Sequence, residues 1–361
     1  MKRICIVAGA RPNFVKVAPL IRAIEQAEGA EYLLVYAGRE DDPTLEGSLF
    51  DDLQMPRPQV YLGVDSESLN EITSRVMSAF DALLDRYAAD VVIVVDDLAS
   101  TMAAAIVTKK RGRQLAHLVA GTRSFDMNMP KEVNRLVIDA LSDYLFTAGV
   151  KSSSVASREQ GDGTNTYMVG NILMDSLRFN YSRFVKPDIP GIEAGNYLVF
   201  TLNRRALLAD ETNLRRMLTS MIAAADGTPI IAPLRGRAAE LVGSLLTSPM
   251  SEPARSLSSF LLVPPLSYLQ FGWLTAKAKG IITDSGNVAE EATFNSVPCI
   301  TLNSYTEHQE TVTVGSNVLV GEDADKLGQE VARMVRGEWK KCALPDRWDG
   351  RTAERIVRTI L

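Results

Sequence analysis

Histidine, cysteine and long apolar runs are scarce in this sequence, and each shortage excludes a class of protein or of binding site. Its 361 residues include two histidines and three cysteines, Cys5, Cys299 and Cys342. An odd number of widely spaced cysteines argues against a disulfide framework or a zinc site, so we expect reduced thiols in a cytoplasmic protein without a bound metal. No stretch reaches the roughly eighteen apolar residues of a membrane helix, so we expect no membrane span.

The chain also lacks a long basic run, and its formal net charge is -5. This balance argues against binding to nucleic acid or to an anionic membrane, and favours a small ligand. A length of 361 residues exceeds what one hydrophobic core usually serves, so we expect two domains with a ligand cleft between them.

Short β-branched runs alternate with helical patterns along most of the chain. In the first half the runs are residues 3–9, 32–38, 91–95, 115–121, 143–149 and 166–170, and in the second half 197–203, 228–234, 259–266, 279–286, 297–302 and 317–321. This alternation predicts βαβ units on parallel sheets, with helices beginning near Phe14 and Asp210. Prolines and glycines interrupt it at residues 184–196, so we predict domains at 1–183 and 197–361 joined by a linker. The last helix, from about Thr352, fits either domain.

The stretch GARPNFVKVAP, residues 9–19, joins the first strand to a helix. Backbone amides at a helix N-terminus, together with Arg11 and Lys16, are typical of an anion site. A tight turn with two solvated cations explains the same residues equally well.

The stretch TDSGNVAEEA, residues 283–292, repeats this arrangement in the second half. Ser285 and the amides after it suit a diphosphate, and an acidic residue in the helix, Glu290 or Glu291, suits the ribose hydroxyls. The alternative is an ordinary helix N-cap, although a cap alone does not require Gly286.

These two stretches lie among several that carry a family resemblance. The others are residues 129–135, 169–177, 265–274 and 348–356. In this order they resemble the UDP-N-acetylglucosamine 2-epimerase family. The resemblance implies two Rossmann-like domains facing a central cleft, the glycosyltransferase B arrangement, with the sugar on the first domain and UDP on the second. It also implies a homodimer through the first domain, a role in cell-surface polysaccharide biosynthesis and no cofactor.

The same resemblance assigns the binding residues for a UDP-N-acetylhexosamine. Ser285, Gly286, Asn287 and Glu291 are expected to hold the diphosphate and ribose, and Arg11 to reach them from the first domain. Lys16, Arg204 and His308 complete the expected binding set.

Several acid/base positions of the family are substituted here. The family's carboxylates fall on Val119 and Lys131, and its histidines on Glu40, Val95, Asn203 and Arg235. Since family members remove the proton on C2 of the sugar and expel UDP, the chemistry needs a placed base and donors for the leaving diphosphate. The loop within HLVAGTRSFDMNMPKEVNR, residues 117–135, is therefore predicted to hold a substrate more than to move protons.

Three functions stay open on this sequence. The first is an isomerase in which Asp97, Glu132 or Lys131 supplies protons, Lys131 only with a pKa lowered by burial. The second is a hydrolase or glycosyltransferase that breaks the anomeric bond, and the third is a catalytically silent nucleotide-sugar-binding partner. His117 either donates a structural hydrogen bond or contacts the ligand. A helix cap at the end of the loop explains Asp96 as well as a role in the functional site does.

Overall fold

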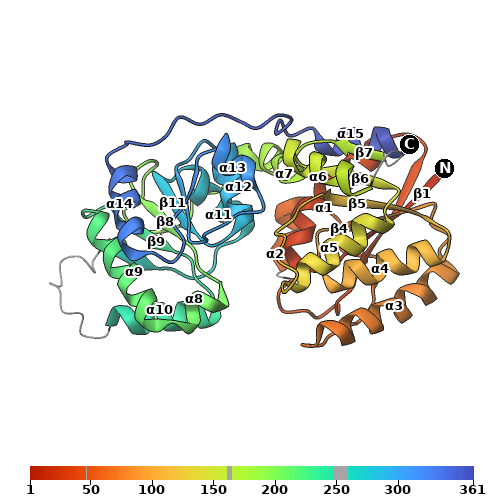
Figure 1. Ribbon diagram of the computed structural model, residues 1–361, viewed down its shortest axis with the longest axis horizontal. Coiled ribbons are helices and arrows are strands. Elements are labelled where there is room, and N and C mark those ends of the chain that lie inside the picture. Colours follow the sequence, from red (N-terminus) through yellow and green to blue (C-terminus); the bar gives the residue numbers. More distant parts are fainter. Residues whose placement is uncertain (46, 161–164, 248–258) are drawn as a thin grey trace. The chain divides into compact units, whose positions relative to one another are not determined.

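The computed structural model describes residues 1–45, 47–160, 165–247 and 259–361. Contacts divide the chain into two compact units, which are described separately below (Figure 1). Unit 1 consists of Met1–Phe179 together with Asp346–Leu361, and unit 2 is Asn180–Pro345. Within the described ranges, no helix combines the length and apolar character required to cross a membrane.

Unit 1 is built on a parallel sheet of seven strands in the order β3-β2-β1-β4-β5-β6-β7. The strands are β1 (Lys2–Ala8), β2 (Ala30–Tyr36), β3 (Val60–Tyr61), β4 (Val91–Val95), β5 (Gln114–Ala120), β6 (Tyr144–Thr147) and β7 (Asn165–Met168). Strand β4 reads VVIVV and is buried on both faces, as expected for a central strand of such a sheet. The order reverses between β1 and β4, which is the place where ligands bind in open α/β sheets.

Helices connect the strands of unit 1 and cover its sheet. They are α1 (Arg11–Gln26), α2 (Gly47–Leu53), α3 (Leu69–Arg86), α4 (Ala99–Lys110), α5 (Pro130–Leu141), α6 (Val150–Gln160) and α7 (Ile172–Asn180), the last of which ends at the unit boundary and is followed by a 3-10 turn (Tyr181–Arg183). Apolar side chains of α3, α4 and α5 join Cys5, Val7, Val92 and Val94 of the sheet in one buried cluster. Figure 1 shows these three helices running side by side.

Helix α1 begins at Arg11, three residues before the predicted start at Phe14. The side-chain oxygen of Asn13 accepts hydrogen bonds from the amides of Gly9 and Ala10, at 2.8 and 3.1 Å. Pro12 stands in the first turn, where its missing N–H costs no helix hydrogen bond. The helix therefore starts as soon as the chain leaves β1.

Unit 2 repeats the arrangement with a parallel sheet of six strands, in the order β10-β9-β8-β11-β12-β13. The strands are β8 (Leu198–Phe200), β9 (Ile230–Ala232), β10 (Phe260–Leu262), β11 (Gly280–Thr283), β12 (Cys299–Thr301) and β13 (Asn317–Leu319). Its helices are α8 (Arg205–Ala209), α9 (Glu211–Ala224), α10 (Gly236–Thr247), α11 (Tyr268–Ala276), α12 (Gly286–Phe294), α13 (Gln309–Thr313) and α14 (Ala324–Val335). One cluster packs α9, α10 and α14 on the sheet, and another packs α11 and α12 on it.

Residues 184–196, the predicted linker, pack on unit 2. Ile189 and Ile192 join the buried cluster under α11. The ring of Phe184 approaches Gly272 so closely that an added Cβ would stand 2.3 Å from Cε1 of that ring. The prolines and glycines of this stretch thus mark an irregular but packed segment.

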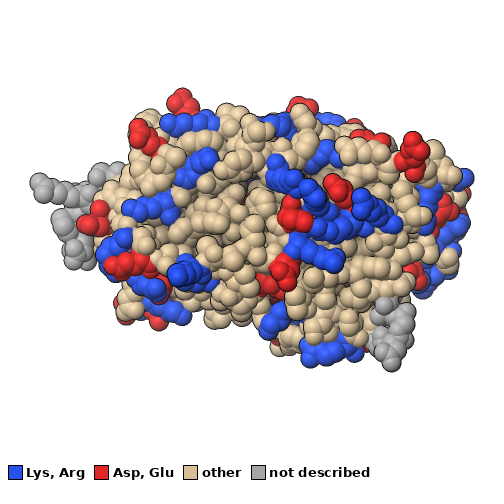
Figure 2. Space-filling view, turned by 90° about the horizontal axis from the view of Figure 1, so that it is seen from above, with Lys and Arg blue, Asp and Glu red and all other residues tan. Residues whose placement is uncertain are grey.

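The last helix, α15 (Thr352–Ile360), belongs to unit 1 and packs against α1. Asp175 of α7 fixes its start, because the two carboxylate oxygens accept the amides of Thr352 and Ala353 at 3.0 and 2.8 Å. Figure 2 shows basic side chains gathered on the face where α15 lies. Arg351 and Arg358 are exposed there, so the apolar side of this short helix faces inward.

We predict that Asp175→Ala loosens α15, because two buried helix-start amides lose their acceptor. The free energy of unfolding should fall by about 1–3 kcal/mol, and the amides of α15 should exchange faster with deuterium. Glu354→Ala, at an exposed position of the same helix, is the control and should change little. Equal effects of the two substitutions would contradict this role of Asp175.

Candidate functional site

The turn after β4 carries two aspartates. Asp96 has a left-handed backbone, with φ of 59°. Its carboxylate accepts a hydrogen bond from Nδ2 of Asn13 at 2.7 Å and pairs with Nζ of Lys16 at 2.5 Å. Lys16 is buried, and its ammonium group forms an ion pair with Asp96.

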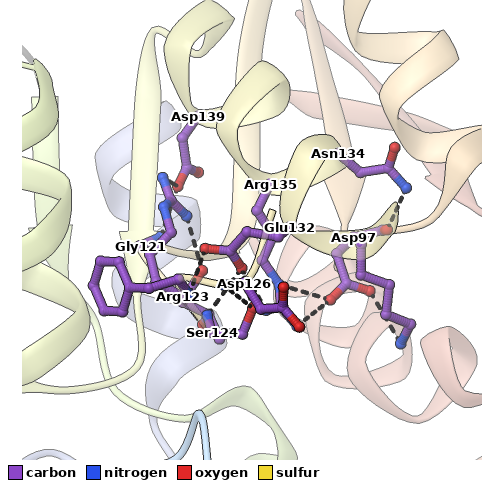
Figure 3. Close-up of polar contacts among 12 residues, drawn as sticks. Asp97, Gly121, Arg123, Ser124, Asp126, Glu132, Asn134, Arg135 and Asp139 are labelled. Carbon is purple, nitrogen blue, oxygen red and sulfur yellow. Dashed lines mark hydrogen bonds and ion pairs between the residues drawn. The ribbon is translucent and has the colours of Figure 1, made fainter. Parts of the chain in front are cut away.

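Asp97 faces α5, where it pairs with two cations (Figure 3). Arg135 donates through Nε and Nη2 to Oδ2, at 2.8 and 2.6 Å, and Nζ of Lys131 lies 3.3 Å from Oδ1. Burial alone would raise the pKa of Asp97, but Lys131 and Arg135 outweigh it and hold the pKa below its usual value. Asp97 is therefore an ionised carboxylate at neutral pH.

Glu132 holds the loop that precedes α5. Its carboxylate accepts the amides of Ser124 and Phe125, each at 2.9 Å, and the Ser124 hydroxyl at 2.9 Å. Nη1 of Arg135 adds a fourth donor at 3.0 Å. Burial opposes ionisation, but these donors lower the pKa of Glu132. A carboxylate with this many donors is well suited to fix a loop.

A second buried carboxylate, Asp139, lies two turns further along α5. It contacts Nδ1 of His117 at 2.5 Å, accepts the amide of Gly121 at 3.0 Å and pairs with Arg123 at 2.7 Å. Arg123 extends the network to Glu159 of α6. The end of β5 is therefore attached to α5 and α6 by charged groups (Figure 3).

Val119 is the residue on which a family carboxylate falls, and its backbone is strained. Its φ is 75°, a value that a β-branched side chain rarely adopts. The pairing of β5 with β6 shifts register between Leu118 and Ala120, around this residue. Such outliers persist where the surrounding structure over-determines them, often at functional sites.

We predict that Val119→Asn stabilises the protein, because asparagine tolerates a left-handed backbone better than valine. The free energy of unfolding should rise by about 1 kcal/mol, measured by chemical denaturation. Val133→Asn, at an exposed helical position of ordinary backbone, is the matched control and should be neutral or destabilising. A loss of stability in Val119→Asn as large as in the control would refute the strain.

Unit 2 places its polar groups at the corresponding switch point, between β8 and β11. The Asp284 carboxylate accepts the amides of Asn203 and Arg204, at 2.6 and 2.5 Å. Nη1 of Arg204 donates to the side chain of Asn303 at 2.7 Å. The turns after β8, β11 and β12 are thus joined.

Ser285 and Gly286 begin α12. Ser285 is the N-cap, and its hydroxyl accepts the amide of Val288 at 3.5 Å. Nδ1 of His308 contacts Glu290 at 2.8 Å, and a Cβ on residue 286 would stand 3.0 Å from Cδ2 of the same ring. The glycine thus lets His308 lie against the helix start, and the cap is present whatever else the turn binds.

Glu291 follows on α12. Burial of its carboxyl, with the negative charge of Glu290 beside it, raises the pKa of Glu291 to about 8. A carboxyl group in this range gains or loses its proton readily near neutral pH, which is a common property of binding and catalytic groups.

The remaining predicted residues are placed by backbone position. Arg11 is the first residue of α1 and Asn287 the second of α12; both are partly accessible. The structure brings Asp97, Lys131 and Glu132 together in unit 1, and Arg204, Ser285, Gly286 and His308 lie at neighbouring turns of unit 2. The assigned roles and the predicted shared cleft stay predictions.

Sequence reasoning did not find the partners that hold these residues. Asn13, Arg135, Asp139 and Asp284 each fix a strand end. The one available signal was spacing, since Glu132, Arg135 and Asp139 recur at three and four residues along one helical face. Among the described residues, no group of three or more His, Cys, Asp or Glu side chains could hold a metal ion.

Comparison with known proteins gives the family. The model of the UDP-N-acetylglucosamine 2-epimerase family matches residues 22–361. The chain belongs to this family. It is 30% identical to the UDP-N-acetylglucosamine 2-epimerase of Methanocaldococcus jannaschii, over 99% of this chain and 98% of that protein. It is also 29% identical to UDP-2,3-diacetamido-2,3-dideoxy-D-glucuronate 2-epimerase of Pseudomonas aeruginosa, over 93% of each.

The fold agrees with that of solved epimerases. The crystal structure of the M. jannaschii epimerase in complex with UDP-GlcNAc and UDP matches with a TM-score of 0.82 and 29% identity, over 99% of both chains. The two units are accordingly Rossmann-like domains of the glycosyltransferase B type, as predicted from the sequence. UDP-GlcNAc is bound in that relative.

Proposed function

We propose that this protein binds a UDP-N-acetylhexosamine and is an isomerase of the epimerase family in which ordinary C2 epimerisation is slow. The observation that carries this proposal is that the carboxylates beside α5 are already engaged in hydrogen bonds and ion pairs within the protein. Glu132 holds the preceding loop with four donors, which leaves Asp97 as the carboxylate of this cluster for proton transfer. Asp97 itself is paired with Lys131 and Arg135.

The nucleotide part of the proposal is supported by α12. Its N-terminus offers backbone amides and the positive end of a helix dipole to a diphosphate. Glu291 lies one to two turns along, at the distance expected for a ribose acceptor. The relative of known structure has UDP-GlcNAc and UDP bound.

The slow-epimerisation part is supported by the charges of unit 1. Epimerisation removes the proton on C2 and breaks the bond from C1 to UDP. The bond to UDP is then re-formed at C1, and a proton is added to C2 on the opposite face. The side chain of Val119 has no acidic or basic group, and that of Lys131 is 57% exposed and paired with Asp97. An exposed ammonium group that is paired with a carboxylate is poorly suited to remove the proton from C2.

A hydrolase or glycosyltransferase is the second candidate. Breaking the bond to UDP needs cations and amide donors at the leaving group, and it needs no base at C2. A silent binding partner is the third. The cytoplasmic location, the homodimer and the role in polysaccharide biosynthesis stay predictions.

Incubation with UDP-N-acetylglucosamine in deuterated water separates the three functions. We expect binding, with deuterium entering C2 far more slowly than general acid/base groups allow, since each such group contributes about 10²- to 10⁴-fold. Free UDP with sugar release or transfer would favour the second function, and intact substrate with binding the third. Rapid deuterium incorporation in the wild-type protein would contradict slow epimerisation.

The triple variant Val119→Glu, Lys131→Glu and Asn203→His is the companion to this experiment. It returns the family's acid/base residue types to these positions, so the rate of deuterium incorporation should rise. Arg235→His alone, after β9, is the control, because it also restores a family histidine but adds no carboxylate.

We predict that UDP affinity depends on Glu291. Its pKa of about 8 means that the carboxyl is mostly protonated at neutral pH, whereas two ribose hydroxyls are best accepted by the carboxylate. Affinity should therefore rise by about tenfold between about pH 7 and pH 9, measured by calorimetry. Glu291→Gln should abolish this dependence, and Glu291→Ala should cost about 1–3 kcal/mol. An unchanged pH dependence in Glu291→Gln would exclude this role.

A further inference from the structure

His117 lies at the centre of the first unit's charged network, and in the described part of the chain each nitrogen of its ring faces an oxygen acceptor. Nδ1 is 2.5 Å from Oδ1 of Asp139, and Nε2 is 3.0 Å from the backbone oxygen of Asp96. Both partners are oxygen atoms that only accept, one a carboxylate and the other a carbonyl. His117 and Asp139 are each 1% exposed, so water does not replace either partner.

A neutral imidazole has one N–H and one lone pair, and therefore it satisfies only one of these two contacts. The other nitrogen would direct its lone pair at an oxygen in a buried setting, which is costly. The ring with both nitrogens protonated satisfies both contacts.

We propose that His117 is a permanently charged imidazolium that ties the Asp96–Asp97 turn to α5, and so acts as a positioning residue for Asp97. One N–H donates to the carboxylate of Asp139 and the other to the carbonyl of Asp96. The charge is balanced where it lies, because Asp139 is ionised.

The groups around His117 allow a positive charge there. On α5 it faces Asp139. Burial alone would raise the pKa of Asp139, but the nearby His117 and Arg123 outweigh burial and hold this pKa below its usual value. From the loop after β5, Arg123 contacts the other oxygen of Asp139, and its own charge is shared with Glu159 of α6. On the side of β4, the carboxylate of Asp96 is directed to Lys16.

The position of His117 gives the charge a task. Asp96 has a left-handed backbone, and its carbonyl group forms the peptide bond with Asp97. His117 fixes this carbonyl, while Nδ2 of Asn134 donates to the carbonyl of Asp97 at 2.8 Å. Both peptide groups of the turn are thereby held, and the Asp97 carboxylate is presented to Arg135. That Asp97 faces the sugar rests on the proposed function.

The protonation state can be measured directly because the chain has only two histidines. In imidazole ¹⁵N NMR spectra, the His308→Gln variant leaves one ring, that of His117. We expect both of its nitrogens to carry protons from about pH 5 to pH 8, the range in which an ordinary histidine loses its charge. A ring that titrates in this range, or is neutral throughout, overturns the proposal.

The positioning role has its own test in Asp139→Asn. The neutral amide no longer favours the charged ring, so His117 should titrate in the same pH range. The preference for UDP-N-acetylglucosamine over UDP should fall by about tenfold or more, the value of a lost charged hydrogen bond, while affinity for UDP itself stays within about twofold.

Asp175→Asn is the matched control, since it neutralises another buried carboxylate of unit 1 that accepts two backbone amides. It should be destabilised but keep the sugar preference. An unchanged preference in a folded Asp139→Asn protein overturns the positioning role. Absence of UDP binding in the wild-type protein would instead contradict the proposed function, and the NMR measurement would still decide the charge of His117.

Discussion

Compensation of buried charge is the constraint on which the first unit depends. Around the ends of β4 and β5, the largely buried cations are Lys16, His117, Arg123 and Arg135, and the largely buried anions are Asp96, Asp97, Glu132 and Asp139. The more exposed Lys131 and Glu159 pair with members of this set. Buried ion pairs contribute little net stability, but removal of one partner leaves an uncompensated charge and costs several kcal/mol. Such a network contributes more to fixing one geometry of the site than to the free energy of unfolding. Removal of one charge from this site without its partner is therefore expected to be costly.

Both units solve the same geometrical problem with a carboxylate. Strands that are neighbours in a sheet, yet distant in sequence, end in turns that have to be held together. In unit 1 Asp96 joins the turn after β4 to α1, and in unit 2 Asp284 joins the turn after β11 to the turn after β8. Since the strand order reverses at these places, a rigid rim is produced where a ligand of an open α/β sheet binds.

The fold could be predicted from the sequence because almost every strand is a short β-branched run that stands between two helical patterns. The sequence pattern missed β3, whose two residues, Val60 and Tyr61, are too few to show a period. Asp97 was proposed from the family resemblance and Ser285 from its place between a strand and a helix, and their roles stay predictions. The sequence pattern did not find the tertiary partners: the charge pairing of Lys16 with Asp96, and the use of Glu132 to hold a loop, bring together residues that no local pattern relates. Likewise, the left-handed backbone of Val119 has no signal in its residue type.

The path of the chain has a consequence for biosynthesis. Unit 2 is a continuous insertion, whereas unit 1 is closed by α15, which comes from the end of the chain and is fixed by Asp175. On the ribosome, all of unit 2 emerges before the segment that completes unit 1. The surface of α1 that α15 covers therefore stays open while more than 160 residues, the span of Asn180–Pro345, are synthesised. During this interval of about ten seconds or more, the incomplete first unit is the species exposed to chaperones and to aggregation.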